Sequence, residues 1–290
     1  MEAADKIYAL GFTAFFSAPL LVYLVLLAAG RVTVPAAKAK GAGRRIFGPV
    51  FIGYYYWMMR PVFRAAELSG LKPDHITFIS AGAAAATATA IATGHFALAS
   101  ALLIGGSSLD MVDGQLARTK KLETPGGAFL DSTIDRLCDG LIFAGCVVYY
   151  SGSAMMYVSL VALITCYLVS YTRARSESLG LYGAEGLAQR ADRIVMLGIA
   201  MAFSPLVAHR QEGLVSHPHY WLTAFTICVL ALVNTTTAVS RIAWTRRQLA
   251  AGRVTPDVRG LERIELTFVK KPDASRVHKK GLETHGRSTA

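Results

Sequence analysis

The sequence predicts an all-α integral membrane protein with a six-helix transmembrane core, one extra N-terminal transmembrane helix and an interfacial amphipathic helix. Hydrophobic residues make up 53% of the 290-residue chain and charged residues 17%, and the mean hydropathy is +0.40. About seven apolar stretches approach or exceed the roughly 18 residues typical of a transmembrane helix. They lie near 8–29, 75–94, 96–116, 129–150, 154–172, 193–208 and 219–244. This composition excludes an ordinary soluble domain.

The first stretch, near 8–29, can be interpreted as a signal peptide or as a permanent helix. It follows Glu2 and Asp5 instead of a basic segment, and Ala28-Ala29-Gly30 is a weak cleavage site. An uncleaved transmembrane helix, with its basic linker completing residues 1–45, is therefore favoured.

Residues 46–73 combine aromatic and charged side chains. Tyr54-Tyr55-Tyr56-Trp57 is followed by Arg60 and Arg64, and the segment ends near Gly70 and Pro73. Aromatic residues anchor proteins at membrane interfaces, so this pattern predicts an amphipathic helix in the headgroup plane. A short eighth span is the alternative, and the Arg60-Pro61 pair disfavours it.

The core is expected at residues 74–246 and a basic, mostly disordered tail at 247–290. The net charge is +11, and the basic residues gather in 31–72, 118–121, 173–193 and the tail after Arg241. The positive-inside rule then places these segments and the C-terminus in the cytoplasm of a multi-pass protein of the cell membrane, with the N-terminus outside. The tail either binds anionic lipid headgroups or is solvated without a partner, and no nucleic-acid partner is expected.

Four carboxylates lie in otherwise apolar sequence, in D-M-V-D-G-Q-L-A-R-(x8)-G-A-F-L-D-S-T-I-D. Asp110 and Asp113 are separated by three positions, and Asp131 and Asp135 by four, so each pair projects from one helix face. A carboxylate at the centre of a membrane helix costs roughly 2.5–3.5 kcal/mol. Such a group is tolerated when it shares divalent cations or faces a water-filled cavity.

Two carboxylate pairs on adjacent antiparallel helices can bind two Mg²⁺ or Mn²⁺ ions, which stabilise phosphoryl transfer. Gly114 and Gly127 leave room for a ligand near the helix backbone. Arg118, one turn after Gly114, offers a forked guanidinium to a diphosphate. The pattern predicts a metal–diphosphate site at the cytoplasmic membrane face.

This segment resembles the signature of the CDP-alcohol phosphotransferase family, D-x-x-D-G-x-x-A-R-(x8)-G-x-x-x-D-x-x-x-D. The fixed positions are filled by Asp110, Asp113, Gly114, Ala117, Arg118, Gly127, Asp131 and Asp135. One departure is Pro73-Asp74-His75-Ile76-Thr77, where many members read Pro-Asn-x-x-Thr. The extra N-terminal helix and the basic tail lie outside the resemblance.

The resemblance implies transfer of a substituted phosphate from a CDP-alcohol, here CDP-diacylglycerol, to an acceptor hydroxyl with release of CMP. It implies that the four aspartates hold two Mg²⁺ or Mn²⁺ ions and that Asp135 is also the general base. The CDP-alcohol would contact Gly114, Ala117, Arg118 and Gly127. Members generally form dimers, so a homodimer is expected.

Several arginines at helix ends indicate a phosphorylated acceptor, although such arginines are also common membrane anchors. The segments Ser170-Tyr171-Thr172-Arg173-Ala174-Arg175, Gln189–Arg193 and Ser240-Arg241 are similar to the inositol-phosphate pocket of phosphatidylinositol phosphate synthases and their archaeal relatives. That similarity implies that the phosphate of a phosphorylated polyol, most simply inositol phosphate, binds Ser170, Arg175, Arg190, Arg193 and Arg241. Glycerol 3-phosphate, free inositol and serine are alternative acceptors. A membrane prenyltransferase and a transporter with intramembrane carboxylates are more distant alternatives.

Overall fold

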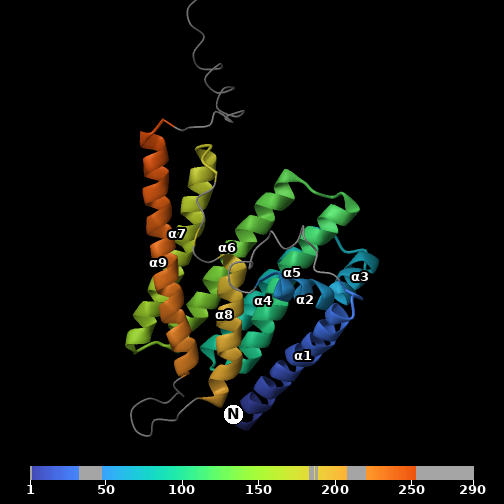
Figure 1. The fold of residues 1–290 in the computed structure, drawn as a ribbon. Coiled ribbons are helices and arrows are strands. Elements are labelled where there is room, and N and C mark those ends of the chain that lie inside the picture. The colour runs from blue at the N-terminus through green and yellow to red at the C-terminus, as the bar shows by residue number, and fades with distance from the viewer. Residues whose placement is uncertain (1, 33–47, 183–185, 187–188, 208–219, 253–290) are drawn as a thin grey trace, which may run out of the picture.

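The computed structural model describes residues 2–32, 48–182, 186, 189–207 and 220–252, and all regular structure in these ranges is helical (Figure 1). The helices are α1 (Glu2–Ala28), α2 (Gly48–Met58), α3 (Arg60–Leu68), α4 (Pro73–Ala92), α5 (Phe96–Lys120), α6 (Pro125–Tyr149), α7 (Ala154–Ser178), α8 (Arg190–Phe203), the 3-10 turn η2 (Ser204–Leu206) and α9 (Trp221–Ala250). The all-α prediction is confirmed.

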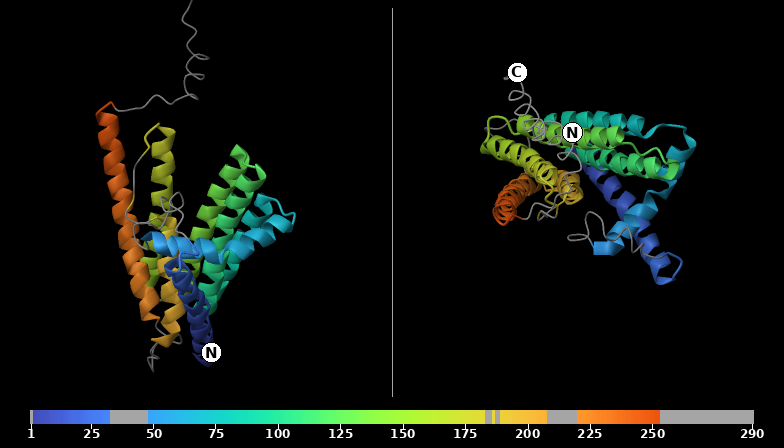
Figure 2. Two further views of the ribbon diagram at one scale, coloured as in Figure 1. Left: turned by 45° about the vertical axis from the view of Figure 1, so that its right-hand side comes forward. Right: turned by 90° about the horizontal axis from the view of Figure 1, so that it is seen from above.

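The six core helices α4–α9 form one bundle. Helix α4 packs against α5 and α6, α7 packs against α6 and α9, and α8 packs against α5 and α9 (Figure 2). Glycines permit the closest contacts, since a Cβ on Gly145 would lie 2.6 Å from the Ala88 carbonyl oxygen and one on Gly106 would lie 2.8 Å from Ala83 Cβ. Small residues that bring backbones together are a common basis of helix packing in membranes.

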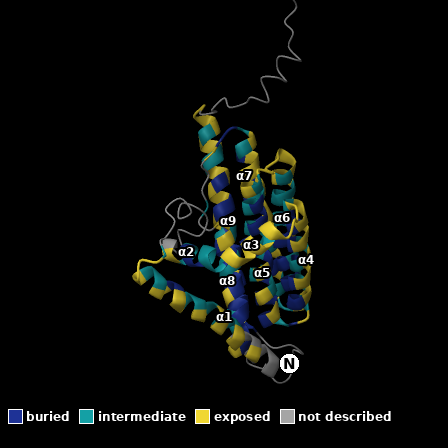
Figure 3. Cartoon of the chain, turned by 90° about the vertical axis from the view of Figure 1, so that its right-hand side faces the viewer, coloured by how far each residue is buried: buried dark blue, intermediate teal, exposed yellow. Residues whose placement is uncertain are grey.

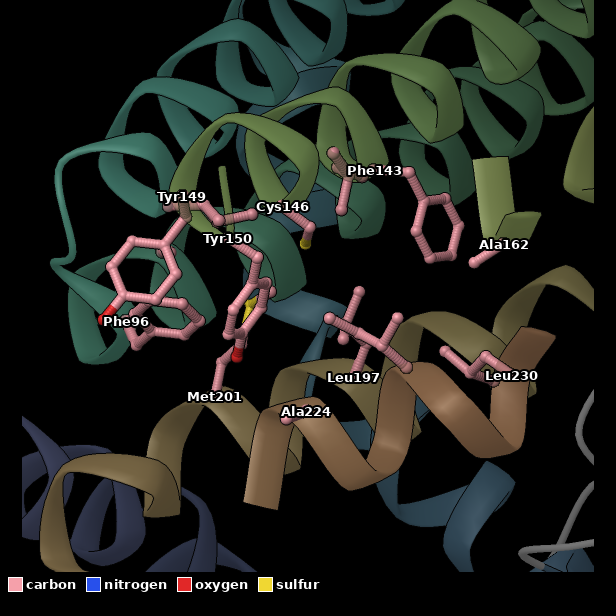
Figure 4. Close-up of a cluster of buried hydrophobic side chains, with 14 of the residues drawn as sticks. Phe96, Phe143, Cys146, Tyr149, Tyr150, Ala162, Leu197, Met201, Ala224 and Leu230 are labelled. Atoms are coloured by element: carbon pink, nitrogen blue, oxygen red, sulfur yellow. The ribbon is translucent and has the colours of Figure 1, made fainter. Parts of the chain in front are cut away.

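The largest hydrophobic cluster takes buried side chains from each of the six helices α4 to α9 (Figure 4). Most of its aromatic residues lie at the end of the bundle opposite the α5–α6 connection. The rings of Phe96 and Tyr149 are 4.7 Å apart, and those of Phe96 and Tyr220 are 4.3 Å apart. The Tyr220 hydroxyl donates a 3.1 Å hydrogen bond to the Gly94 carbonyl. This end of the bundle is therefore closed by packing, which leaves the opposite end for the polar residues.

Within the described ranges, five helices are long and apolar enough to cross a membrane: α1 from residue 10, α4, α5, α7 and α9. Helix α6 has 25 residues but carries the charges of the candidate site. Helix α8 has 14 residues, or about 21 Å at 1.5 Å per residue, which is less than the roughly 30 Å of a bilayer core. A multi-pass membrane fold is thus confirmed, whereas spans at α6 and α8 stay predictions.

Helix α1 leans against one side of the bundle and diverges from it toward α2 (Figure 3). It contacts α5, α8 and η2. At the α2 side, Tyr23 is fully buried beside the rings of Tyr54 and Trp57, each 5.8 Å away. The Tyr54 hydroxyl also donates to the Phe16 carbonyl at 2.6 Å. These contacts fix α1 to the interfacial segment.

The segment predicted as one interfacial helix over 46–73 forms two helices, α2 and α3, separated at Met59, and its place at the membrane interface stays a prediction. Pro61 lies in the first turn of α3. Its nitrogen has no hydrogen for the Trp57 carbonyl, and its ring disfavours a continuous helix. The predicted boundary of the tail at 247 is also early, since α9 continues to Ala250; residues 253–290 lie outside the described ranges.

Candidate active site

The two carboxylate pairs lie on α5 and α6, the helices on either side of one short connection, and Asp131 is an electrostatic neighbour of both Asp110 and Asp113. Helix α5 ends at Lys121, whose φ of 55° reverses the chain. Thr124 caps α6 by accepting a 3.0 Å hydrogen bond from the Gly127 backbone nitrogen. This short connection places the last turns of α5, with Asp110 and Asp113, antiparallel to the first turns of α6, with Asp131 and Asp135.

Arg190, the first residue of α8, joins the two helices. Its Nη1 lies 2.6 Å from Asp110 Oδ2 and 2.8 Å from Asp135 Oδ1. A capping box between Gln189 and Asp192 fixes the start of α8 and therefore the position of this arginine. The structure thus brings together Asp110, Asp135 and Arg190, three residues that the sequence assigned to the site.

Asp139 is a fifth carboxylate of the site, and the sequence analysis did not identify it. It is 8% exposed and accepts hydrogen bonds from Arg190 Nε at 3.0 Å and Arg193 Nη2 at 3.2 Å. Cys166 Sγ also lies 3.5 Å from Asp139 Oδ2. Its sequence signal was its position four residues after Asp135 in an apolar helix, which places both on one face.

Asp113 is the most buried of the four motif aspartates, at 3% exposure. Thr77 of α4 donates a 2.6 Å hydrogen bond to Asp113 Oδ2. Asp110 and Asp131 are electrostatic neighbours of Asp113. Thr77 was not predicted as a site residue, although it is the threonine of the Pro73–Thr77 segment that matches the Pro-Asn-x-x-Thr pattern except at Asp74.

The carboxylate set fits hard divalent cations, since it offers only oxygen ligands. Arg190 is a cation that lies between Asp110 and Asp135, where a metal ion would neutralise the same charges. In the described part of the chain, no three His, Cys, Asp or Glu side chains converge closely enough to hold a metal. Arg190 and a divalent cation would therefore compete for Asp110 and Asp135.

The residues expected to bind the CDP-alcohol lie at the α5–α6 end of the bundle. A Cβ on Gly114 would lie 3.5 Å from Arg118 Nη1, so the exposed Arg118 folds back over Gly114. A Cβ on Gly127 would lie 3.2 Å from Thr124 Oγ1 and 3.8 Å from Asp74 Oδ1. Ala117 is partly exposed on α5.

Arg193 and Arg241 form a second group of arginines, which the Arg193–Asp139 ion pair connects to the carboxylates. Arg193 is 6% exposed and Arg241 is 8% exposed. Arg241 Nη1 donates a 2.7 Å hydrogen bond to the carbonyl of Val169, which precedes Ser170. Arg241 Nε is buried without a hydrogen-bond partner among the described residues, and Arg173 and Arg193 are its cationic neighbours.

Arg175 does not join this group in the structure. It is exposed in the last turn of α7. Arg173, one turn away from Glu177, forms a 2.8 Å ion pair with that residue. The arginines that the sequence grouped together are therefore divided, with Arg190, Arg193 and Arg241 buried or partly buried and Arg175 outside.

Comparison with known proteins relates the chain to one enzyme family. The profile of the family described as CDP-alcohol phosphatidyltransferase matches residues 71–181. The chain is 35% identical to archaetidylinositol phosphate synthase of Methanothermobacter thermautotrophicus over 195 residues, covering 66% of this chain and 93% of that protein. It is 33% identical to phosphatidylinositol phosphate synthase of Streptomyces avermitilis over 187 residues, covering 62% and 75%.

Solved structures show the same likeness. The crystal structure of Mycobacterium tuberculosis phosphatidylinositol phosphate synthase with CDP-DAG bound has a TM-score of 0.55 and 27% identity, covering 64% of this chain and 92% of that one. The same enzyme in complex with manganese and citrate has a TM-score of 0.56, covering 64% and 87%. The chain is a multi-pass membrane enzyme that belongs to the CDP-alcohol phosphatidyltransferase family.

Proposed function

We propose that this enzyme transfers the phosphatidyl group of CDP-diacylglycerol to a hydroxyl of inositol phosphate, which yields phosphatidylinositol phosphate and CMP. One observation carries the choice of acceptor: Arg193 and Arg241 are both more than nine-tenths buried. Arg193 is paired with Asp139, and Arg241 is an electrostatic neighbour of Arg193. A buried arginine without a full complement of partners favours an anionic ligand. The names of the relatives agree with this acceptor.

Asp110, Asp113, Asp131 and Asp135 would hold two divalent cations, Mg²⁺ or Mn²⁺. Such ions, when bound, stabilise negative charge that develops on the diphosphate. Thr77 orients Asp113 through its hydrogen bond, and a ligand held in this way is positioned before the metal arrives. The structure of the mycobacterial relative in complex with manganese supports a divalent cation as a cofactor of this chain.

Gly114, Ala117, Arg118 and Gly127 would bind the CDP part of the donor. The absence of a side chain at Gly114 leaves its backbone accessible beneath the Arg118 guanidinium. That guanidinium can bind a phosphate oxygen with two parallel hydrogen bonds. The donor's diphosphate would thus lie between the arginine and the aspartates.

Asp135 would act as the general base. One of its carboxylate oxygens accepts the proton of the acceptor hydroxyl. At the same time the hydroxyl oxygen of the acceptor forms a bond to the β-phosphorus, and the bond from this phosphorus to the bridging oxygen of the diphosphate breaks. The electron pair of the broken bond leaves with CMP. In the structure Asp135 Oδ1 is bonded to Arg190, so release of Arg190 would expose the base.

The acceptor phosphate would bind Arg193 and Arg241, with Ser170 beside them and Arg190 after its release from the carboxylates. Arg175 would contribute only if the end of α7 moved, since it is exposed. Glycerol 3-phosphate carries the same anion and is the second candidate acceptor. Free inositol and serine would leave the buried arginines without a phosphate partner.

The site is proposed to face the cytoplasm, with the N-terminus outside, because the basic connections share its side of the membrane. The functional unit is proposed to be residues 74–246, and the assembly a homodimer. Residues 1–45 and 46–73 would add the first helix and the interfacial helices. Cysteine accessibility in sealed vesicles would test the orientation, and crosslinking in membranes would test the dimer.

An acceptor screen tests the proposed reaction. Purified protein in detergent should release CMP from CDP-diacylglycerol when inositol phosphate and Mg²⁺ or Mn²⁺ are supplied, and EDTA should stop the release. Parallel reactions would contain glycerol 3-phosphate, free inositol or serine. Faster CMP release with glycerol 3-phosphate than with inositol phosphate would identify glycerol 3-phosphate as the acceptor. Absence of metal-dependent CMP release with every acceptor would refute the proposed reaction.

A further inference from the structure

Asn234, in the middle of α9, carries a buried amide group. The residue is 1% exposed, and its Nδ2 has no hydrogen-bond partner within the described ranges. Amide side chains in membrane helices usually hydrogen-bond to a neighbouring helix, and nearly all buried donors in proteins have a partner. A buried donor that the described chain leaves unpaired points to a ligand.

The face of α9 that carries Asn234 also carries Arg241. Asn234, Thr237 and Arg241 are separated by three and four positions, which places them on one side of the helix, and all three are buried. Nε of Arg241 is likewise buried without a partner among the described residues. Two unpaired N–H donors, one of them on a cation, therefore lie on the same face of α9, which favours an anionic ligand.

The Arg241 guanidinium extends back along α9 toward Asn234. A Cβ on Gly186 would lie 2.5 Å from Thr237 Cγ2 and 3.2 Å from Arg241 Nη2. These two atoms border the same point, although Arg241 follows Thr237 by one turn of the helix. The guanidinium thus lies toward the N-terminal end of α9, the direction in which helical side chains tilt, and the lack of a side chain at Gly186 leaves room beside it.

Arg193 of α8 lies at a similar depth in the bundle to Asn234. Leu197 of α8 and Leu230 of α9 share the largest hydrophobic cluster (Figure 4), and the two helices run in opposite directions (Figure 1). Arg193 precedes Leu197 by one turn, on the side of this contact toward the aspartates. Asn234 follows Leu230 by one turn, which places it on the same side. Arg193 is also an electrostatic neighbour of Arg241, so the amide and the two guanidinium groups border one polar region between α8 and α9.

We propose that Asn234 is a further acceptor-binding residue, whose Nδ2 donates a hydrogen bond to an oxygen of the acceptor phosphate. The inference rests on the proposed function, since it adds a residue to the proposed acceptor site. The phosphate would also accept from Nε of Arg241, and both buried donors would then be paired. An amide adds a directed donor without a further charge, so Asn234 would fix how deep the phosphate binds between α8 and α9.

Replacing the amide by an apolar group of similar volume tests the inference. Asn234→Leu should bind inositol phosphate about tenfold or more weakly than the wild type, the usual effect of losing one hydrogen bond to a charged group. Calorimetric titration of the purified protein in detergent, with Mg²⁺ present and without the CDP-lipid, measures the affinity. Thr226→Val is the matched control, because Thr226 is buried on the same helix eight residues earlier and its hydroxyl bonds to the Leu222 carbonyl. Wild-type affinity in Asn234→Leu would overturn the assignment.

The unfolding temperature separates binding from folding. Without ligand, Asn234→Leu should keep the unfolding temperature of the wild type or exceed it, because the donor that it removes has no partner among the described residues. Asn234→Asp keeps the size of the side chain and replaces the donor by a negative charge, so it should bind inositol phosphate more weakly still. Wild-type affinity in Asn234→Asp would overturn the assignment even if Asn234→Leu failed to fold.

Other phosphates separate this inference from the proposed reaction. Glycerol 3-phosphate and inorganic phosphate should lose affinity for Asn234→Leu by a similar factor, because the proposed contact is to the phosphate group itself. Failure of the wild type to bind any of the three phosphates would overturn the inference. Wild-type protein that binds inositol phosphate but releases no CMP would reject the proposed reaction alone.

Discussion

Arg190 Nη1 lies 2.6 Å from Asp110 Oδ2, so the first residue of α8 neutralises the first aspartate of the motif. The same nitrogen is 2.8 Å from Asp135 Oδ1. A guanidinium and a divalent cation compete for the same carboxylate oxygens. Under the proposed function, Arg190 would therefore link metal binding to acceptor binding, since it would contact an acceptor phosphate only after these carboxylates had bound other cations.

Arg190→Gln should bind Mn²⁺ more tightly than the wild type. The substitution removes a competing cation, and charge-assisted hydrogen bonds are worth about 1.5–3 kcal/mol, so an increase in affinity of about tenfold or more is expected. Calorimetric titration of Mn²⁺ in detergent measures it. Arg173→Gln is the matched control, because Arg173 pairs with Glu177 outside the site. Unchanged or weaker Mn²⁺ binding by Arg190→Gln would contradict the competition.

Asp135→Asn should abolish most turnover while the fold is kept. The amide cannot accept the proton of the acceptor hydroxyl, and loss of a general base lowers rates by about 10²–10⁴-fold. CMP release measures the rate, and the unfolding temperature in detergent reports the fold. Glu123→Gln, in the exposed α5–α6 connection, should retain wild-type activity. Substantial turnover by Asp135→Asn would exclude it as the base.

Asp139→Asn should raise KM for inositol phosphate about tenfold and change KM for the CDP-lipid little. Asp139 holds both Arg190 and Arg193, so its neutralisation frees the two guanidinium groups from their fixed positions. Initial rates with each substrate varied separately measure the effect. Cys166→Ser, which retains a hydrogen-bond donor to Asp139, is the control. A parallel rise of both KM values with a lower unfolding temperature would indicate a structural role only.

The fold class and the grouping of the candidate site's aspartates could be predicted from sequence because their signals are local. Apolar stretches mark helices, and the Asp110–Asp135 motif places its carboxylates by helical spacing alone. Partners from distant segments could not be predicted in this way. Arg190 lies 51 residues from Asp139, and only the packing of α8 against α5 shows that it bonds to the aspartates. Thr77 likewise meets Asp113 through the contact between α4 and α5.

The boundaries of the helices were harder to predict, because a continuous helix and an interrupted one differ little in free energy at a residue such as Pro61. The Arg60-Pro61 pair argued against a transmembrane span, yet the same proline also divides the interfacial segment into α2 and α3. Arg175 shared a helix end with Ser170, but its side chain is exposed. A pattern of residue types shows which residues are near a membrane face, whereas the rotation of each helix decides which of them point into the site.

Gly145→Ala should lower the free energy of unfolding by about 1–3 kcal/mol, the usual cost of overpacking. The added Cβ would lie 2.6 Å from the Ala88 carbonyl oxygen, a backbone atom that can move only with α4. Thermal unfolding in detergent measures the loss. Gly82→Ala, whose Cβ meets no atom within 4 Å, should have little effect. Equal stability of the two variants would mean that α4 and α6 can separate at low cost.

Thr77→Val should weaken Mn²⁺ binding about 10–100-fold, the usual effect of removing a partner that orients a metal ligand. Valine keeps the shape of threonine but cannot donate to Asp113 Oδ2, which now receives a 2.6 Å hydrogen bond. Thr77→Ser restores the hydroxyl and should recover most of the affinity. Calorimetric titration of Mn²⁺ compares the three proteins, and KM for inositol phosphate should change little because Thr77 is on the α4 side of the site. Equal affinity of Thr77→Val and wild type would show that Asp113 is held by packing alone. Equal losses in the valine and serine variants would show that a hydroxyl at residue 77 does not by itself restore the affinity, which would contradict the assignment of the effect to the hydrogen bond.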